Sequence, residues 1–310
     1  MSTVDFPAGV QVFERGWLSA NNILFTGDGP VTLIDSGYVT HAAQTLALVE
    51  HALGERPLER LMNTHLHSDH CGGNAALQAR YGCHTAIPAP ESAAVSSWND
   101  AALTYQATGQ QCPRFSFDAT LVPGQRLMLA GAEWEVLGAP GHHPHAVMFW
   151  SARDGILIPG DALWRNGFGV IFPELEGEPG FEEARATLEL IGTLDARIVI
   201  PGHGAVFTDV AAALGRARTR LDFLQADPVR NAENAIKVML KFLLLERQQM
   251  PLPDIAALME AIPLVATARR LYFDMDPAAL ADWAVTGLVR AGAARRDGDV
   301  LRNRDLVTPG

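Results

Sequence analysis

Short apolar runs alternate with amphipathic stretches along the first part of the chain. The apolar runs are typical of β-strands, and they fall at residues 10–13, 22–25, 31–35 and 58–63. Gly27-Asp28-Gly29-Pro30 separates two of these runs and predicts a hairpin turn. Residues 40–53 space their apolar side chains at helical intervals, and a second helix is predicted from Asn74.

The middle of the chain returns to strands after an irregular excursion. Residues 88–118 mix prolines, aromatic residues and polar residues, and we expect a helical excursion that covers a site or packs on the body. Strands are predicted at residues 81–87, 120–138, 146–150, 155–159 and 198–201, and a helix is predicted at 181–193. Strands that alternate with helices in this way favour an α/β fold.

The pattern changes after Gln225-Ala226-Asp227-Pro228. Helical periodicity runs through residues 232–249 until Pro251 interrupts it. Three further helices and a final hairpin are predicted at residues 254–261, 264–273, 277–291 and 292–302. We therefore expect two domains, residues 1–224 and residues 225–310.

Composition limits the classes of protein to consider. With 310 residues, 48% hydrophobic and 19% charged, the chain can bury a sizeable core. The net charge is −11, and the acidic excess lies in residues 1–224, which argues against a broad nucleic-acid surface. The 3 cysteines are irregularly spaced and suggest no disulfide framework. We see neither a signal peptide nor a membrane-spanning run, so we expect a cytoplasmic protein without a membrane partner.

Candidate chemistry is concentrated in residues 64–70, Thr-His-Leu-His-Ser-Asp-His. This stretch brings His65, His67, Asp69 and His70 together directly after a predicted strand. Four metal-competent side chains so close together are hard to explain by packing. Imidazole nitrogens and carboxylate oxygens suit zinc, and they suit iron or manganese less selectively. Because ligands of α/β proteins bind at the carboxyl ends of strands, we predict a metal site at this edge of the sheet.

Three later segments repeat one arrangement, an apolar strand followed by a glycine-containing turn and a ligand-type side chain. These side chains are His142, Asp161 and His203. Asp35, at the end of an earlier strand, can cap the next helix or support the metal loop. We interpret His143 and His145 as exposed loop residues, with a supporting role near the metal as the alternative.

Four blocks in this order resemble the metallo-β-lactamase superfamily of hydrolases. They are His65-Leu66-His67-Ser68-Asp69-His70, Pro140-Gly141-His142, Gly160-Asp161 and Pro201-Gly202-His203-Gly204. One such motif is moderately specific, whereas four in order are a strong signal. The resemblance implies an αββα sandwich, in which two mixed sheets lie face to face, helices cover the outside and metals bind at one edge.

The resemblance also implies a set of metal ligands. His65, His67 and His142 would bind a first metal, Asp69, His70 and His203 a second, and Asp161 would bridge both. Asp35 matches an early aspartate that supports the site without binding metal. The implied cofactors are two divalent ions, zinc in the first place, with manganese or iron as alternatives. The bridging residue is Asp rather than the Cys of some true β-lactamases, which disfavours β-lactamase activity.

Ligands of this kind can hold two divalent cations about 3.5–4 Å apart, and a water between them loses a proton near neutral pH. The bridging hydroxide would attack a carbonyl or phosphorus, and Asp69 can orient it and help to protonate the leaving group. We expect a hydrolase of a small thioester, ester or lactone, similar to hydroxyacylglutathione hydrolases. We recognise no glutathione-binding motif, and Trp164 stands near the position where some lactonases place a tyrosine.

Two other enzyme classes stay open. An iron-dependent sulfur dioxygenase acting on persulfides would use one metal, held by His67 or His65 with His142 and Asp161. A metal-dependent nuclease or phosphodiesterase would need a surface that binds nucleic acid. The second metal set is complete, which favours two metals, and the acidic body argues against a nucleic-acid partner.

The C-terminal helices and hairpin resemble a winged-helix domain. Its arginines are a candidate nucleic-acid contact: Arg290, Arg295, Arg296, Arg302 and Arg304. Interleaved aspartates make the segment neutral, so we favour a module that packs on the active-site cleft or mediates a homodimer. The aromatic residues within 98–117, with Trp164, Phe168, Phe172 and Phe181, are expected to shape an apolar pocket or a subunit contact.

Overall fold

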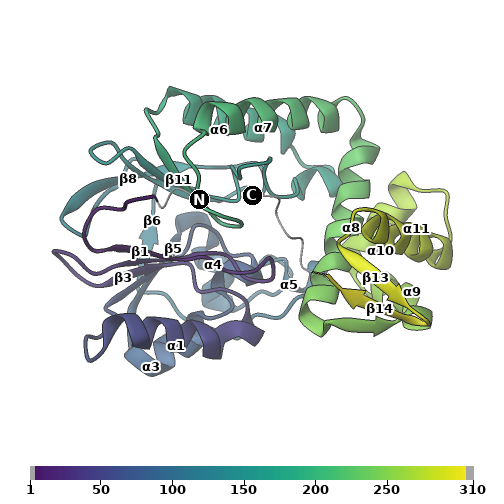
Figure 1. The fold of residues 1–310 in the computed structure, drawn as a ribbon, viewed down its shortest axis with the longest axis horizontal. Helices are drawn as coiled ribbons and strands as arrows, with labels where there is room; N and C mark the ends of the chain where they lie inside the picture. Colours follow the sequence, from purple (N-terminus) through teal and green to yellow (C-terminus); the bar gives the residue numbers. More distant parts are fainter. Residues whose placement is uncertain (1–3, 305–310) are drawn as a thin grey trace.

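The computed structural model describes residues 4–304, so the outermost residues of the two expected domains, 1–3 and 305–310, lie outside this part. Two β-sheets lie face to face, and helices cover their outer sides (Figure 1). The strands of the first sheet, in spatial order, are β1 (Val10–Phe13), β2 (Asn22–Phe25), β3 (Thr32–Ile34), β4 (Arg60–Met62), β5 (His84–Pro88) and β6 (Ala119–Leu121). β1 to β3 pair antiparallel, through the predicted Gly27–Pro30 hairpin, and β3 to β6 pair parallel.

The second sheet is also mixed. Its strands, in spatial order, are β11 (Ile198–Pro201), β10 (Ile156–Gly160), β9 (Val147–Ser151), β8 (Ala132–Gly138) and β7 (Arg126–Leu129). β10 and β11 pair parallel and the remaining strands pair antiparallel. The carboxyl ends of β10 and β11 therefore lie at the same edge of the sheet.

The core between the sheets is built from apolar side chains of both. Phe25 of the first sheet and Trp134 of the second are almost fully buried, and their rings meet edge to face with centroids 5.3 Å apart. Burying a large apolar side chain of this kind contributes about 1.5–3 kcal/mol. The alternation of buried and exposed positions along β8 shows that one face of this strand supplies the core.

Four helices form the outer layers. α1 (Ala42–Leu53) and α3 (Asn74–Tyr81) pack on the first sheet, and α6 (Phe181–Thr193) and α7 (Val210–Gln225) pack on the second (Figure 1). In α1 the buried residues Thr45, Val49 and Leu53 follow each other at four-residue intervals, as an amphipathic helix requires. The expected αββα sandwich of two mixed sheets is confirmed.

The segment 88–118 is mostly part of the body. It contains three short elements, η2 (Ala89–Glu91), α4 (Ser92–Ser97) and α5 (Tyr105–Thr108). The aromatic residues of the segment, Trp98, Tyr105, Phe115 and Phe117, pack in one cluster with the buried Cys71. Two further short helices, η1 (Val39–His41) and η3 (Pro173–Leu175), lie in connections, and α2 (Ser68–Cys71) lies within the predicted metal loop.

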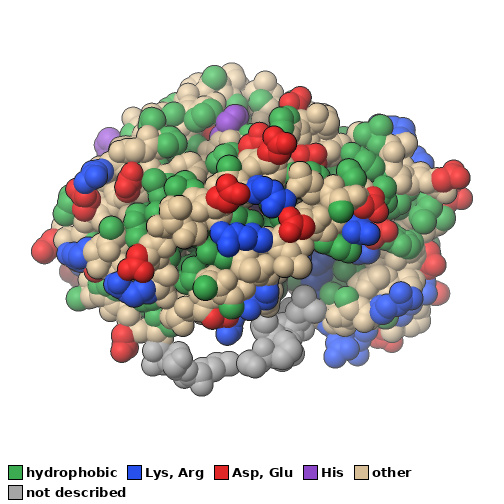
Figure 2. All heavy atoms as spheres, turned by 90° about the horizontal axis from the view of Figure 1, so that it is seen from above, with side chains coloured by type: hydrophobic (Ala, Val, Ile, Leu, Met, Phe, Trp, Pro, Cys, Tyr) green, Lys and Arg blue, Asp and Glu red, His purple; other side chains and the backbone are tan. Residues whose placement is uncertain are grey.

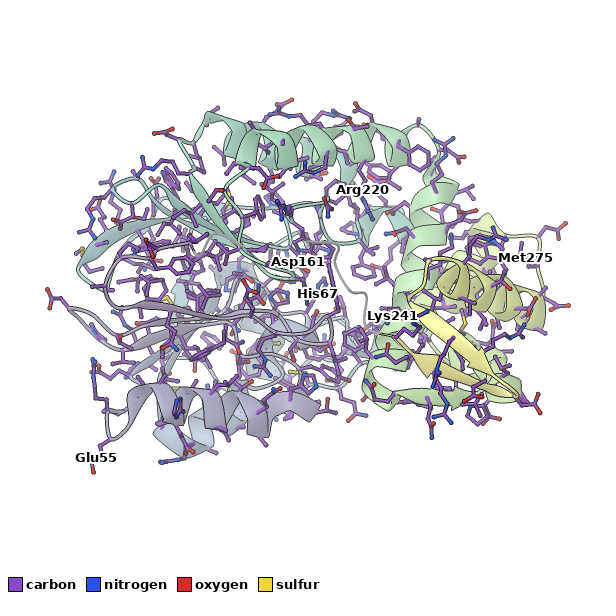
Figure 3. All side chains as sticks on the ribbon, viewed as in Figure 1. Glu55, His67, Asp161, Arg220, Lys241 and Met275 are labelled. Atoms are coloured by element: carbon purple, nitrogen blue, oxygen red, sulfur yellow. The ribbon has the colours of Figure 1, made fainter. Side chains whose placement is uncertain are left out.

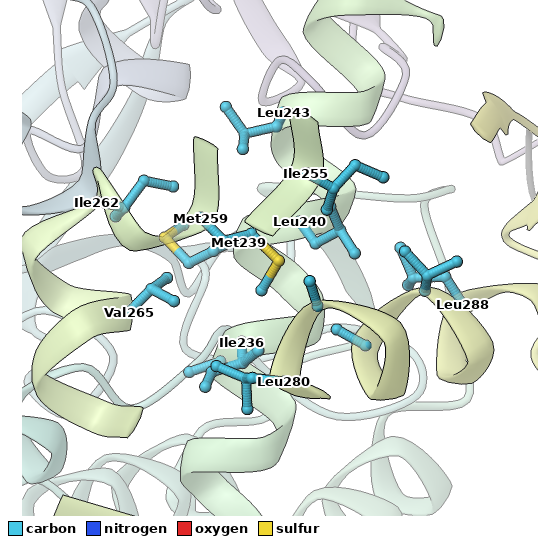
Figure 4. Packing of buried hydrophobic residues seen from close by; sticks show 14 of the residues in the cluster. Ile236, Met239, Leu240, Leu243, Ile255, Met259, Ile262, Val265, Leu280 and Leu288 are labelled. Carbon is cyan, nitrogen blue, oxygen red and sulfur yellow. The ribbon is translucent and has the colours of Figure 1, made fainter. Parts of the chain in front are cut away.

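The C-terminal part is mostly helical, with a small sheet. Its elements are α8 (Pro228–Arg247), β12 (Gln249–Pro251), α9 (Leu252–Glu260), α10 (Pro263–Tyr272), α11 (Pro277–Arg290), β13 (Ala294–Asp297) and β14 (Val300–Asn303). The helices share one apolar core, in which α8 supplies Ile236, Met239 and Leu240 (Figure 4). The hairpin at β13 and β14 is found as predicted, and Gly298 at its turn has a positive φ of 59°.

Two helices differ from the prediction. α8 begins at Pro228 rather than at residue 232, because Asp227 caps it by accepting a hydrogen bond from Val229 N at 3.2 Å. α7 was not predicted, since alanines make up much of its buried stripe and the contrast between its faces is weak. The division at residue 224 and the winged-helix assignment stay predictions. Among residues 4–304, no helix combines the length and the apolar character that crossing a bilayer requires.

Candidate metal centre

The residues predicted to bind metal converge at one edge of the sandwich. His65 and His67 follow β4, and the short helix α2 then turns the chain so that Asp69 and His70 face the same region. The other three come from the second sheet, after β8, β10 and β11, and are His142, Asp161 and His203. The short extended strands therefore bring side chains far apart in sequence to one place.

Three imidazoles form the first group of donors. His67 Nδ1 lies 3.1 Å from His65 Nε2 and 2.8 Å from His142 Nε2. The other nitrogen of His142, Nδ1, donates to the carbonyl oxygen of Val170 at 2.5 Å, which leaves its Nε2 free to be a ligand. All three donor atoms lie within 4.8 Å of one another, as a single cation would require.

Asp69, His70 and His203 form the second group. Their donor atoms also lie within 4.8 Å of one another, and His203 Nε2 is 3.1 Å from Asp69 Oδ2. Asp161 lies between the two groups, because its carboxylate oxygens are 3.5 Å from His70 Nε2, 3.5 Å from His142 Nε2 and 3.7 Å from His203 Nε2. A carboxylate in this position can bind two cations at once.

Burial and protonation suit divalent cations at this site. Burial, followed by the surrounding imidazoles, lowers the pKa of His65 and His67 well below the usual histidine value, so both rings are neutral, the form that binds metal. Burial raises the pKa of Asp161, but the charges of His203 and His70 outweigh it and leave that pKa below its usual range. His70 Nε2 is buried and makes no hydrogen bond within the described chain. The donor set therefore fits divalent metal ions.

Asp35 supports this centre from the end of β3. Its carboxylate accepts hydrogen bonds from Thr64 N at 2.9 Å and Thr64 Oγ1 at 2.8 Å, and it lies 2.8 Å from His70 Nδ1. Asp35 also has a positive φ of 59°, which few residues other than glycine, asparagine and aspartate adopt. The contacts match the supporting role that the sequence suggested for Asp35.

Two tryptophans near the centre were not predicted as site residues. Trp164 Nε1 donates to Asp161 Oδ1 at 3.0 Å, so it orients the carboxylate between the two groups. Trp17 stacks on the ring of His203, with centroids 5.7 Å apart and planes 3° from parallel. Trp164 was predicted only as an aromatic wall, and no motif marks Trp17, because its neighbour is far away in sequence.

The interpretation of His143 as an exposed loop residue is wrong. His143 is 5% exposed, and its ring lies 4.9 Å from that of His67, because the loop after β8 folds inward. Its Nε2 is 3.5 Å from a carboxylate oxygen of the buried Glu91, which also lies 2.6 Å from His145 Nδ1. His145 is more exposed, as expected, and Glu91 fixes the loop that carries His142.

An apolar cavity of about 240 Å³ opens beside the candidate ligands. His67, Asp69, His142, Asp161 and His203 line its floor. Its walls are Trp17, Trp164, Phe168, Phe172, Val238, Met239, Phe242 and Leu245, together with the polar residues Thr108, Gln110, Arg220, Asn234 and Lys241. The helix α8 supplies much of one wall, and Figure 3 shows His67 and Asp161 at the edge of the sandwich that faces this helix.

The residues that line the cavity contradict the expectation for Phe181 and agree with the expectations for the other three aromatic residues and for the C-terminal part. Phe181 packs in the core behind the second sheet and does not line the cavity, whereas Trp164, Phe168 and Phe172 do. Of the C-terminal part, helix α8 walls the cleft, as favoured from the sequence. On the face shown in Figure 2, acidic and basic side chains are interspersed rather than gathered into one basic surface.

Comparison with known proteins points to one family. The sequence model of the metallo-beta-lactamase superfamily matches residues 15–203. Hydroxyacylglutathione hydrolase from Rhodospirillum rubrum is 28% identical over 158 residues, which are 51% of this chain and 52% of that protein. The enzyme of the same name from Xanthomonas euvesicatoria pv. vesicatoria is 32% identical over 192 residues, 62% and 63% of the two chains. This chain thus spans about half the length of the first curated relatives it matches.

Solved structures share the fold. A beta-lactamase domain protein from Burkholderia ambifaria aligns with a TM-score of 0.59 and 19% identity, over 97% of this chain and 94% of that one. A second protein, crystallised in a di-iron-bound form, aligns with a TM-score of 0.54 and 26% identity, over 68% of this chain and 100% of its own.

Proposed function

Because this chain belongs to the metallo-beta-lactamase superfamily, we propose that it is a metal-dependent hydrolase with a binuclear centre that acts on a small thioester, ester or lactone. The observation that carries the proposal is the convergence of two three-residue donor groups on the carboxylate of Asp161. An apolar cavity that opens onto these donors provides space for a small substrate.

We assign His65, His67 and His142 to the first cation, Asp69, His70 and His203 to the second, and Asp161 to both. Three features support this assignment: the separation of the donor atoms, their burial, and the neutral imidazoles of His65 and His67. Zinc is the metal we expect from nitrogen and carboxylate donors, and manganese or iron would fit the same residues.

When bound, the cations would lower the pKa of a water and polarise the oxygen of the substrate carbonyl. The residues of this chain do the rest. Asp69, held by His203, has a carboxylate at the cavity floor that can accept the proton of the attacking water and return it to the leaving group. Trp164 fixes the orientation of Asp161, and Asp35 fixes that of His70.

The thioester class is favoured by the relatives, because several proteins 28–32% identical to this chain are named hydroxyacylglutathione hydrolases. The apolar side chains of the walls can contact the apolar part of a small acyl group. Glutathione itself is not part of the proposal. A nucleic-acid substrate is disfavoured, because Arg296 and Arg302 of the C-terminal part pair with Asp282 and Asp297.

The test combines metal analysis with a substrate panel. Protein purified without added metal or chelator should contain about two divalent ions per chain and should hydrolyse thioesters, esters or lactones. The variant His203→Ala should lose one of the two ions, whereas His84→Ala, which changes an exposed histidine outside the site, should keep both. A single iron per chain, with oxygen uptake on persulfides, would replace the proposal by a dioxygenase.

A further inference from the structure

We propose that the substrate ends in a carboxylate and that Arg220 binds this group inside the cavity; this inference rests on the proposed function. The acyl or alcohol part of such a substrate would be a short apolar chain lying between the candidate metal centre and the guanidinium. Arg220 comes from α7 and lines the same cavity as His142 and Asp161 (Figure 3).

The guanidinium of Arg220 has unused hydrogen-bonding capacity. Its Nη2 donates to Asn234 Oδ1 at 3.2 Å, whereas its Nε is buried and has no partner in the described part of the chain. No carboxylate of residues 4–304 lies within 4.0 Å of it. A guanidinium has five N–H donors in a planar fork that matches the two oxygens of a carboxylate, and only one of its three nitrogens has a hydrogen-bond partner in residues 4–304.

The other cationic side chains nearby are committed to partners in the fold. Arg216, one turn earlier on α7, pairs with Asp209 at 3.0 Å and donates to the carbonyl oxygen of Arg165. Lys241, the other cation of the cavity wall, donates to Ala293 O at 2.8 Å and to the side chain of Asn303 at 2.6 Å. Arg220 is thus the cavity cation with donors to spare for a ligand.

The surroundings of the Arg220 guanidinium favour the binding of an anionic group. Burial lowers the pKa of the guanidinium, which means that the charged form lacks the solvation it would have in water. The guanidinium carbon lies 5.6 Å from the centre of the Phe168 ring, another wall residue. A bidentate carboxylate would restore the lost interactions in a site of low dielectric constant.

The segment Gly167–Val170 approaches both Arg220 and the candidate ligand His142. A side chain at Gly167 would meet Arg220 Cδ at 2.9 Å, and one at Gly169 would meet the His142 ring at 2.4 Å. Two residues of backbone span at most about 7 Å, so Arg220 and His142 contact nearby points of one short segment.

Isothermal titration calorimetry with the metal-loaded full chain tests the inference. The probes are straight-chain dicarboxylates of increasing length, each beside the monocarboxylate of the same length. A hydrogen-bonded charge pair predicts that one dicarboxylate binds about ten- to a hundredfold more tightly than its monocarboxylate. Arg220→Gln should abolish this preference, Arg220→Lys should keep part of it, and Arg216→Gln should leave it unchanged.

Each outcome decides one of the two proposals. Equal binding of the two series to the wild-type chain, or an undiminished preference in Arg220→Gln, would overturn the role of Arg220. Turnover plays no part in this assay, so a chain that hydrolyses none of the esters in the panel overturns the proposed function alone. If Arg220→Gln does not fold, the charge-retaining Arg220→Lys, which lacks the planar fork, still separates carboxylate recognition from simple charge attraction.

Discussion

Replacing Asp35 by asparagine tests whether the second metal site depends on this residue. The carboxylate is 1% exposed and holds Thr64 and His70 with three contacts of 2.8–2.9 Å. Asparagine keeps the shape and tolerates the φ of 59°, so the fold should survive. However, the amide nitrogen would face His70 Nδ1, and the ring would then carry its proton on Nε2, the atom that has to bind the cation.

The expected loss follows from the hydrogen bonds involved. A hydrogen bond to a charged group contributes about 1.5–3 kcal/mol, and the loss of such a supporting residue lowers metal affinity about 10- to 100-fold. Competition with a chromogenic chelator at neutral pH measures the two binding steps. In Asp35→Asn the weaker step should fall by this factor, while the group of His65, His67 and His142 should keep its affinity.

A matched control exists directly before strand β6. Asp118 also accepts a backbone N–H, that of Thr85 at 2.9 Å, but lies outside the centre and is half exposed. Asp118→Asn should therefore leave both binding steps unchanged. If Asp35→Asn bound both metals as tightly as the wild-type chain, the reasoning that links Asp35 to the orientation of His70 would be refuted.

Four other predictions concern the centre and its loop. His67→Ala should abolish hydrolysis with an unchanged circular dichroism spectrum, and activity on the true substrate that survived this change would contradict the metal mechanism. Trp164→Phe should lower kcat about tenfold, because it removes one charge-assisted hydrogen bond to Asp161, and a steady-state assay that showed no change would argue against this orienting role. Glu91→Ala should lower the free energy of unfolding by about 2 kcal/mol in urea titrations, since His145 loses its hydrogen-bond acceptor and His143 a carboxylate 3.5 Å from its Nε2, and Glu91→Gln should lose less. Removal of metal by a chelator should lower Tm and added zinc should restore it, as expected for ions that bind only the folded chain; an identical Tm with and without metal would exclude a site formed by folding.

The convergence of the candidate ligand residues could be predicted because each lies in a short segment directly after an apolar strand. The strand ends bring such segments to one edge, so local sequence and the direction of the strands were sufficient for His142 and His203. The hairpins and most helices could be predicted for the same reason, because the residues that indicate them are neighbours in the sequence.

Residues whose role depends on contacts between distant elements could not be predicted. Arg220 lies on a helix whose pattern was too weak to identify, and its partner Asn234 belongs to another helix. Glu91 and His143 meet across more than fifty residues of sequence, so neither gives a local signal. The burial of His143 could not be predicted either, because its local sequence is that of an ordinary loop histidine. Only the structure shows that this loop folds inward.

Different elements of the fold supply the candidate metal ligands and the far walls of the cavity. The sandwich supplies the donor residues from strand ends, which are rigid because both sheets share one core. The helices α7 and α8 supply the far walls of the cavity, and with them Arg220 and Asn234. The proposed metal chemistry could therefore serve different substrates in related chains if only these helices changed, since none of the seven candidate ligands lies on them. On this reasoning, specificity for a carboxylate-bearing substrate belongs to the α7–α8 wall, and reactivity belongs to the strand ends.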